Sequence, residues 1–149
     1  VYYTYRVPPL GINKLRAVKK EQKLYLWNWS LPQEDSIRFE NMVAGHLLKW
    51  IHRRQDGFGE EWDLRYFRDT AGREVDFILT LDETPKLLLE CKLSDTEIHP
   101  PLRYLKDRLP KTETRQVYFQ GKKDYETPDE IRLTSFPTFW KDWLEKYPM

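Results

Sequence analysis

The spacing of apolar residues predicts an amphipathic helix over residues 35–53. Its apolar residues recur every three or four positions and so lie along one stripe of a helix: Phe39, Val43, Leu47, Trp50 and Ile51. Asp35 or Ser36 can cap the first turn through a side-chain oxygen. Glu40 lies one position from the stripe, about 100° around the helix axis. We therefore expect a carboxylate at the edge of the buried face of this helix.

Alternation of apolar and polar residues begins after an expected loop at residues 56–59 and predicts a meander of three strands. These strands cover residues 64–69, 74–81 and 86–94, with turns at residues 70–72 and 82–85. The short turns make neighbouring strands antiparallel. A further strand is expected before the helix, over residues 23–30, because Pro32 closes its pattern.

The last part of the chain predicts helices that flank this sheet. Two prolines at residues 100–101 can open a helix that extends to Pro110, and a strand follows over residues 115–120. A strand, a helix and a strand in this order imply a right-handed parallel crossover. A strand at residues 131–135 and a helix after Pro137 complete the pattern. The expected fold class is therefore α/β (α+β), with a mixed sheet flanked by helices.

Size and composition fit one globular domain. The chain has 149 residues, a length that suits a single hydrophobic core, and 40% of them are hydrophobic. No apolar run approaches the roughly 18 to 20 residues that a membrane helix needs, and no signal segment opens the chain. The single cysteine, Cys91, excludes an internal disulfide and a cysteine-based zinc site. We therefore expect a cytoplasmic protein without a membrane partner.

The first residues suggest a piece of a longer protein, because the chain begins with Val1 rather than Met. A basic run follows, which contains Lys14, Arg16, Lys19, Lys20 and Lys23. This run is either a solvated linker or a local patch that contacts a DNA backbone, since the net charge of +1 provides no overall attraction to nucleic acid. We expect residues 1–23 to be the tail of an upstream unit and a linker, and residues 24–149 to be the domain itself.

Two carboxylates and an ammonium converge on neighbouring strands of the expected meander. Glu90 and Lys92 are two positions apart and so point to one face of their strand. Asp76 alternates with apolar residues on the preceding strand and can lie near Glu90. Like charges that are buried together repel, and a divalent cation offsets this cost. Oxygens of Asp76 and Glu90, with the carbonyl of Cys91 beside them, suit Mg²⁺ or Mn²⁺.

The chemistry of these groups fits metal-assisted hydrolysis of a phosphodiester. Lys92 could position or deprotonate a water, or neutralise charge that develops on a phosphate. The same residues also fit an exposed cluster of cross-strand salt bridges, which is common in antiparallel pairs. For Glu40, the alternative to a functional role is a carboxylate at the helix edge that is solvated or paired with an Arg or Lys. These interpretations stay open on the residues alone.

Asp76, followed after a hairpin by Glu90-Cys91-Lys92, with Glu40 on an upstream helix, resembles the PD-(D/E)xK motif of restriction-endonuclease-like nucleases. The order of helix, three strands, helix and strand is similar to the core of that superfamily. Within it, three stretches and the preceding Lys23-Leu-Tyr-Leu look like the C-terminal domain of a family of prokaryotic AAA-type ATPases: Phe39-Glu40-Asn41, Glu74-Val75-Asp76-Phe77 and Leu89-Glu90-Cys91-Lys92. The resemblance implies metal binding by Asp76 and Glu90, a catalytic Lys92 and an auxiliary carboxylate at Glu40.

The resemblance further implies a Mg²⁺- or Mn²⁺-dependent nuclease that acts on DNA and follows an ATPase domain. This chain has no G-x-x-x-x-G-K-[ST] loop, so we do not expect it to bind ATP itself. The main alternative is a non-catalytic module that binds nucleic acid or protein and regulates the ATPase. A dimerisation domain that uses exposed aromatic residues is the third alternative. In that case the chain would form an oligomer.

Overall fold

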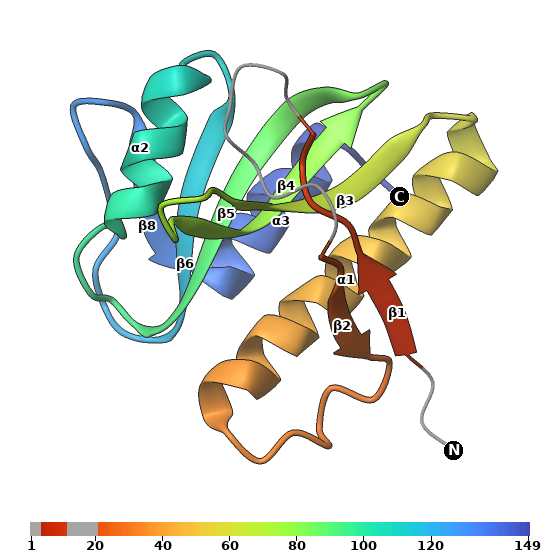
Figure 1. Ribbon diagram of the computed structural model, residues 1–149, viewed down its shortest axis with the longest axis horizontal. Helices are drawn as coiled ribbons and strands as arrows, with labels where there is room; N and C mark the ends of the chain where they lie inside the picture. Colours follow the sequence, from red (N-terminus) through yellow and green to blue (C-terminus); the bar gives the residue numbers. More distant parts are fainter. Residues whose placement is uncertain (1–3, 12–20) are drawn as a thin grey trace.

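A six-stranded mixed sheet forms the middle layer of the structure, a computed structural model that describes residues 4–11 and 21–149 (Figure 1). Its strands lie in the order β3 (Trp62–Arg68), β4 (Glu74–Leu81), β5 (Thr84–Ser94), β6 (Glu113–Gln120), β8 (Ile131–Ser135) and β7 (Tyr125–Glu126). Strands β3, β4 and β5 are antiparallel neighbours, whereas β5, β6 and β8 run parallel. The expected meander, crossover and mixed sheet are confirmed.

Helices cover both faces of this sheet, with a separate apolar core under each face. α1 (Asp35–Phe58) and α3 (Phe136–Lys146) pack on one face, and α2 (Pro100–Arg108) packs on the other (Figure 1). Alternation along β5 supplies both cores, since Leu87 and Leu89 face α1 and α3 while Leu88 faces α2. All five residues of the expected helical stripe are buried. None of the helices within the described residues has the length and hydrophobicity of a membrane-spanning segment.

A two-stranded sheet joins the N-terminal residues to α1. β1 (Thr4–Val7) pairs antiparallel with β2 (Lys23–Leu26), and Val7 and Tyr25 are buried in the same core as α1. Asn41 of α1 brackets the last residue of β2. Its Oδ1 accepts from the Leu26 N–H at 3.0 Å, and its Nδ2 donates to the Leu26 carbonyl at 2.5 Å. The expected division after residue 23 remains a prediction, and it would fall within β2.

The first helix is longer than the apolar stripe predicts. Residues 56–58 continue α1, so the expected loop at residues 56–59 is wrong. The helix ends at Gly59, whose φ of 67° lies in the left-handed region that glycine adopts without steric cost. The Gly59 N–H donates to the carbonyl of Gln55 at 3.0 Å and thereby satisfies one of the last carbonyls of the helix.

The strand before α1 is shorter than expected. β2 ends at Leu26 rather than at residue 30, because the chain turns and the Leu31 N–H donates to the Asn28 carbonyl at 3.3 Å. The alternation beyond Leu26 came from Trp27 and Trp29, which lie beyond the end of β2 and are exposed, although the Trp27 ring contacts that of Tyr5 in β1. The two-residue β7, which the sequence did not predict, extends the opposite edge of the main sheet.

We expect Asn41→Ala to lower the free energy of unfolding by about 2 kcal/mol or more, because it leaves the N–H and carbonyl of Leu26 without partners. Urea unfolding followed by circular dichroism measures this change. Asn28→Ala is the matched control, since Asn28 is exposed and bonds only within its own turn among the described residues. Equal losses in the two variants would contradict the anchoring role of Asn41.

Candidate functional site

A cavity of about 350 Å³ lies where the first turns of α1 meet β4 and the C-terminal half of β5. It is lined by nine residues: Ser36, Ile37, Glu40, Glu74, Asp76, Glu90, Cys91, Lys92 and His99. The four residues expected to be catalytic, Glu40, Asp76, Glu90 and Lys92, are all among them. The structure therefore brings together side chains from one helix and two strands.

The pairing of β4 with β5 brings Asp76 next to Glu90. Phe77 pairs with Leu89, and because the strands are antiparallel the next positions along them are Asp76 and Glu90. The ladder stops here, and the Cys91 N–H donates to Asp76 Oδ2 at 3.0 Å instead of to the backbone of β4. Only 15% of the Asp76 side chain and 3% of the Glu90 side chain are exposed.

Carboxylates crowd this cavity and change one another's titration. The side chain of Asp76 lies within hydrogen-bonding reach of those of Glu40 and Glu90. Burial raises the pKa of Asp76 to about 7, and the contact with Glu90 adds to this effect. Burial likewise raises the pKa of Glu40 to about 8, with the contact to Asp76 as the second cause. Burial also raises the pKa of Glu90. The cavity therefore favours bound protons or cations at neutral pH.

Lys23 lies inside this carboxylate cluster. Its Nζ is 2.5 Å from Glu74 Oε1, 3.6 Å from Glu40 Oε1 and 3.8 Å from Asp76 Oδ1. We expected Lys23 to belong to a basic patch for a DNA backbone, but its ammonium faces these carboxylates instead. The other members of that patch lie outside the described residues: Lys14, Arg16, Lys19 and Lys20.

Sequence reasoning missed Glu74 and His99 as members of the site. Glu74 was not among the predicted site residues, although its position two residues before Asp76 puts both on one face of a strand and could have revealed it. His99 precedes α2, and no local pattern connects it to Glu90. Its Nε2 lies 3.0 Å from Glu90 Oε2 and 3.1 Å from the carbonyl of Glu74.

One oxygen of Glu90 is buried without a hydrogen-bond partner among the described residues. The nearby His99 Nε2 forms its hydrogen bond with the Glu74 carbonyl, so its short distance to Glu90 Oε2 does not satisfy that oxygen. Burial lowers the pKa of His99, and the charge of Lys92 lowers it further, so the ring is neutral near pH 7. A buried carboxylate oxygen without a donor is costly, and a cation or a water would relieve that cost.

The donor set fits a hard divalent cation. Asp76 and Glu90 supply carboxylate oxygens, and the backbone of Cys91 lies in the same cavity. Among the described residues, no three or more His, Cys, Asp or Glu side chains are arranged as a metal-ligand set. The ligands here would be two carboxylates with backbone and water oxygens, a combination that suits Mg²⁺, which retains several waters.

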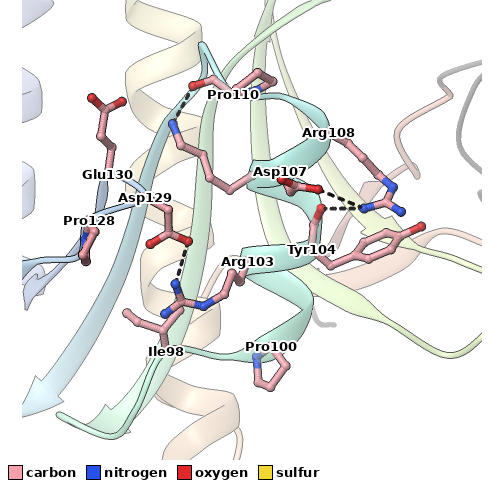
Figure 2. Close-up of a pocket in the computed structure, with 11 residues that line it drawn as sticks. Ile98, Pro100, Arg103, Tyr104, Asp107, Arg108, Pro110, Pro128, Asp129 and Glu130 are labelled. Carbon is pink, nitrogen blue, oxygen red and sulfur yellow. Dashed lines mark hydrogen bonds and ion pairs between the residues drawn. The ribbon is translucent and has the colours of Figure 1, made fainter.

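Another hollow, of about 860 Å³, lies beside α2 and contains charges that are already paired (Figure 2). Arg103 Nη1 donates to Asp129 Oδ2 at 2.6 Å, and Lys106 Nζ donates to the Pro110 carbonyl at 2.8 Å. The guanidinium of Arg108 lies over the Tyr104 ring, 3.5 Å from its centroid. The carboxylate cavity is therefore the candidate functional site, because an oxygen of Glu90 there has no hydrogen-bond partner among the residues that the structure describes.

In the presence of EDTA, we expect stability to fall by on the order of 2 kcal/mol as the pH rises from 5 to 8. The folded protein keeps protons on Asp76 and Glu40, with pKa values of about 7 and about 8, that the unfolded chain has released above its own pKa near 4. Urea unfolding at several pH values measures this slope. Glu40→Gln should flatten it, and Glu61→Gln, at an exposed position, should not. A slope that is the same in Glu40→Gln and in the unmodified protein would contradict the prediction.

Comparison with known families identifies one match. A family model described as a domain of unknown function, DUF4143, matches residues 37–139, which is more than half of the chain and includes Glu40, Asp76, Glu90 and Lys92. Comparison with curated proteins and with solved structures gives no match. Because the model spans the first helix, the meander, the crossover and the start of the last helix, this chain belongs to the DUF4143 family.

Proposed function

We propose that this chain is a divalent-metal-dependent phosphodiesterase that acts on DNA, with Asp76 and Glu90 as metal ligands. The observation that carries the proposal is the buried, unpartnered oxygen of Glu90, which shares a cavity with Asp76. An exposed salt-bridge cluster would leave these carboxylates in water, whereas the Glu90 side chain is only 3% exposed. Buried like charges without such a role would be a net cost to the fold.

A bound Mg²⁺ or Mn²⁺ would supply Lewis acidity toward a phosphodiester and lower the pKa of a water. Lys92 lines the cavity and makes no ion pair within 4.0 Å among the described residues, so its ammonium is available to a phosphate or to an attacking water. Glu40, with a pKa of about 8 in the metal-free cavity, can hold or release a proton near neutral pH. Asp76 and Glu90 are held in place by the β4–β5 register.

DNA as the substrate and an ATPase domain as the upstream neighbour follow from the resemblance to PD-(D/E)xK domains. The net charge of +1 gives the chain little long-range attraction to a polyanion. Local groups would therefore have to hold the phosphate, and Lys92 is the cation of the cavity that has no carboxylate within 4.0 Å among the described residues. A non-catalytic module that regulates the ATPase is the competing function, and a cleavage assay separates the two.

We expect the purified chain to nick plasmid DNA with Mg²⁺ or Mn²⁺, and EDTA to abolish the reaction. Asp76→Asn, Glu90→Gln and Lys92→Met should each lower the rate by about 100-fold or more, because each removes a ligand or a charge at the reacting phosphate. Gel electrophoresis of supercoiled plasmid measures nicking. Lys86→Met is the matched control for Lys92→Met, since Lys86 lies on the same strand but is exposed and outside the cavity.

Cleavage that persists in Asp76→Asn and Glu90→Gln would place the activity elsewhere or in a contaminant. Absence of cleavage by the unmodified chain, with Mn²⁺ binding retained, would favour the non-catalytic module instead.

A further inference from the structure

The carboxylate cavity has two sides with different charge compensation. On one side, the Lys23 ammonium contacts oxygens of Glu74, Glu40 and Asp76, the nearest at 2.5 Å. On the other side, Glu90 Oε2 has no hydrogen-bond partner among the described residues. Asp76 lies between them, with Oδ1 toward Lys23 and Oδ2 accepting from the Cys91 N–H. A positive charge therefore contacts the carboxylates directly on one side, whereas on the Glu90 side the Lys92 ammonium makes no ion pair within 4.0 Å among the described residues.

Lys23 is held in this position by the fold. It pairs with Val7 in the β1–β2 sheet, three residues before Leu26, which Asn41 brackets. Its side chain is only 17% exposed, and its Nζ lies 5.2 Å from the centroid of the Tyr66 ring. The ammonium is consequently a fixed partner of the carboxylates that line the cavity rather than a mobile surface charge.

The electrostatics of Lys23 agree with a permanent cation. Burial lowers the pKa of Lys23, but attraction to Glu40, Asp76 and Glu74 outweighs this effect and the pKa is raised overall. In the metal-free cavity the carboxylates therefore stabilise the charged form of Lys23. Glu74, which is closest to it, has its pKa lowered: burial acts against this, and the contacts with Lys23 and Arg68 prevail.

We propose that Lys23 takes the place of a second metal ion, so that the cavity binds a single divalent cation on the Glu90 side. This inference rests on the proposed function. Two-metal phosphodiesterase sites hold two divalent ions about 3.5–4 Å apart with shared carboxylates. Here Asp76 is the carboxylate shared between Lys23 and the Glu90 side, at 3.8 Å from the ammonium. The Lys23 ammonium lies among the oxygens of Glu40, Glu74 and Asp76, so a second divalent ion would have to displace it.

The number of bound Mn²⁺ ions tests this inference without reference to activity. Titration of the metal-free chain, with free Mn²⁺ followed by electron paramagnetic resonance, should give about one ion per chain in the unmodified protein and about two in Lys23→Met. Removal of the ammonium leaves the Glu40, Glu74 and Asp76 oxygens free to bind a second ion. Lys23→Gln, whose amide can still donate to Glu74, should also bind about two and serves as the second variant if Lys23→Met does not fold.

Two further variants serve as controls. Lys92→Met carries the same substitution in the same cavity, at a lysine without an ion pair within 4.0 Å among the described residues, and should still bind about one ion. Lys23→Arg keeps the positive charge and should also bind about one.

The outcomes separate this inference from the proposed function. Two ions in the unmodified chain, or one ion with unchanged affinity in both Lys23→Met and Lys23→Gln, would overturn the role of Lys23 and leave the metal-dependent function standing. No Mn²⁺ binding by the unmodified chain would overturn both.

Discussion

Three carboxylates that share one buried space require protons or cations, and this requirement governs the arrangement around the cavity. Glu40, Asp76 and Glu90 come from α1, β4 and β5, and burial raises the pKa of each. Their mutual repulsion would separate them in an isolated hairpin or helix. Packing of the apolar cores on both faces of the sheet keeps them together, because separation of the carboxylates would expose those cores.

The small β1–β2 sheet positions the Lys23 ammonium beside these carboxylates. Asn41 satisfies both backbone groups of Leu26, and this anchors the strand that carries Lys23. The Tyr66 hydroxyl donates to the Glu21 carbonyl at 2.7 Å and ties the chain just before Lys23 to β3. Two neutral hydrogen-bond anchors thus position one charge. The cation from β2 contacts Glu40, Glu74 and Asp76 together, whereas Arg68 of the meander pairs only with Glu74 among these three.

Alternation and helical periodicity were sufficient to predict most of the layer architecture. The meander, the crossover and the buried stripe of α1 follow from local spacing, because one side of each element must be apolar to pack. The end of α1 was not predictable in this way. Residues 56–58 are polar or glycine except for Phe58, and they stay helical because the left-handed Gly59 completes the last turn. The alternation of Trp27 and Trp29 led to the opposite error, because both residues lie beyond the end of β2 and are exposed.

The sequence by itself determined that Glu90 and Lys92 share one face of their strand and that Glu40 borders a buried stripe, because these relations depend only on local periodicity. It allowed Asp76 to lie near Glu90, and the β4–β5 register decided that it does. Tertiary structure alone decided which charges meet them. Lys23 reaches the carboxylates of the cavity through the pairing of β2 with β1 and the approach of β2 to α1, and His99 reaches Glu90 through the loop before α2. Local spacing carries no information about contacts between distant segments, and for that reason the compensating cation was not predicted from sequence.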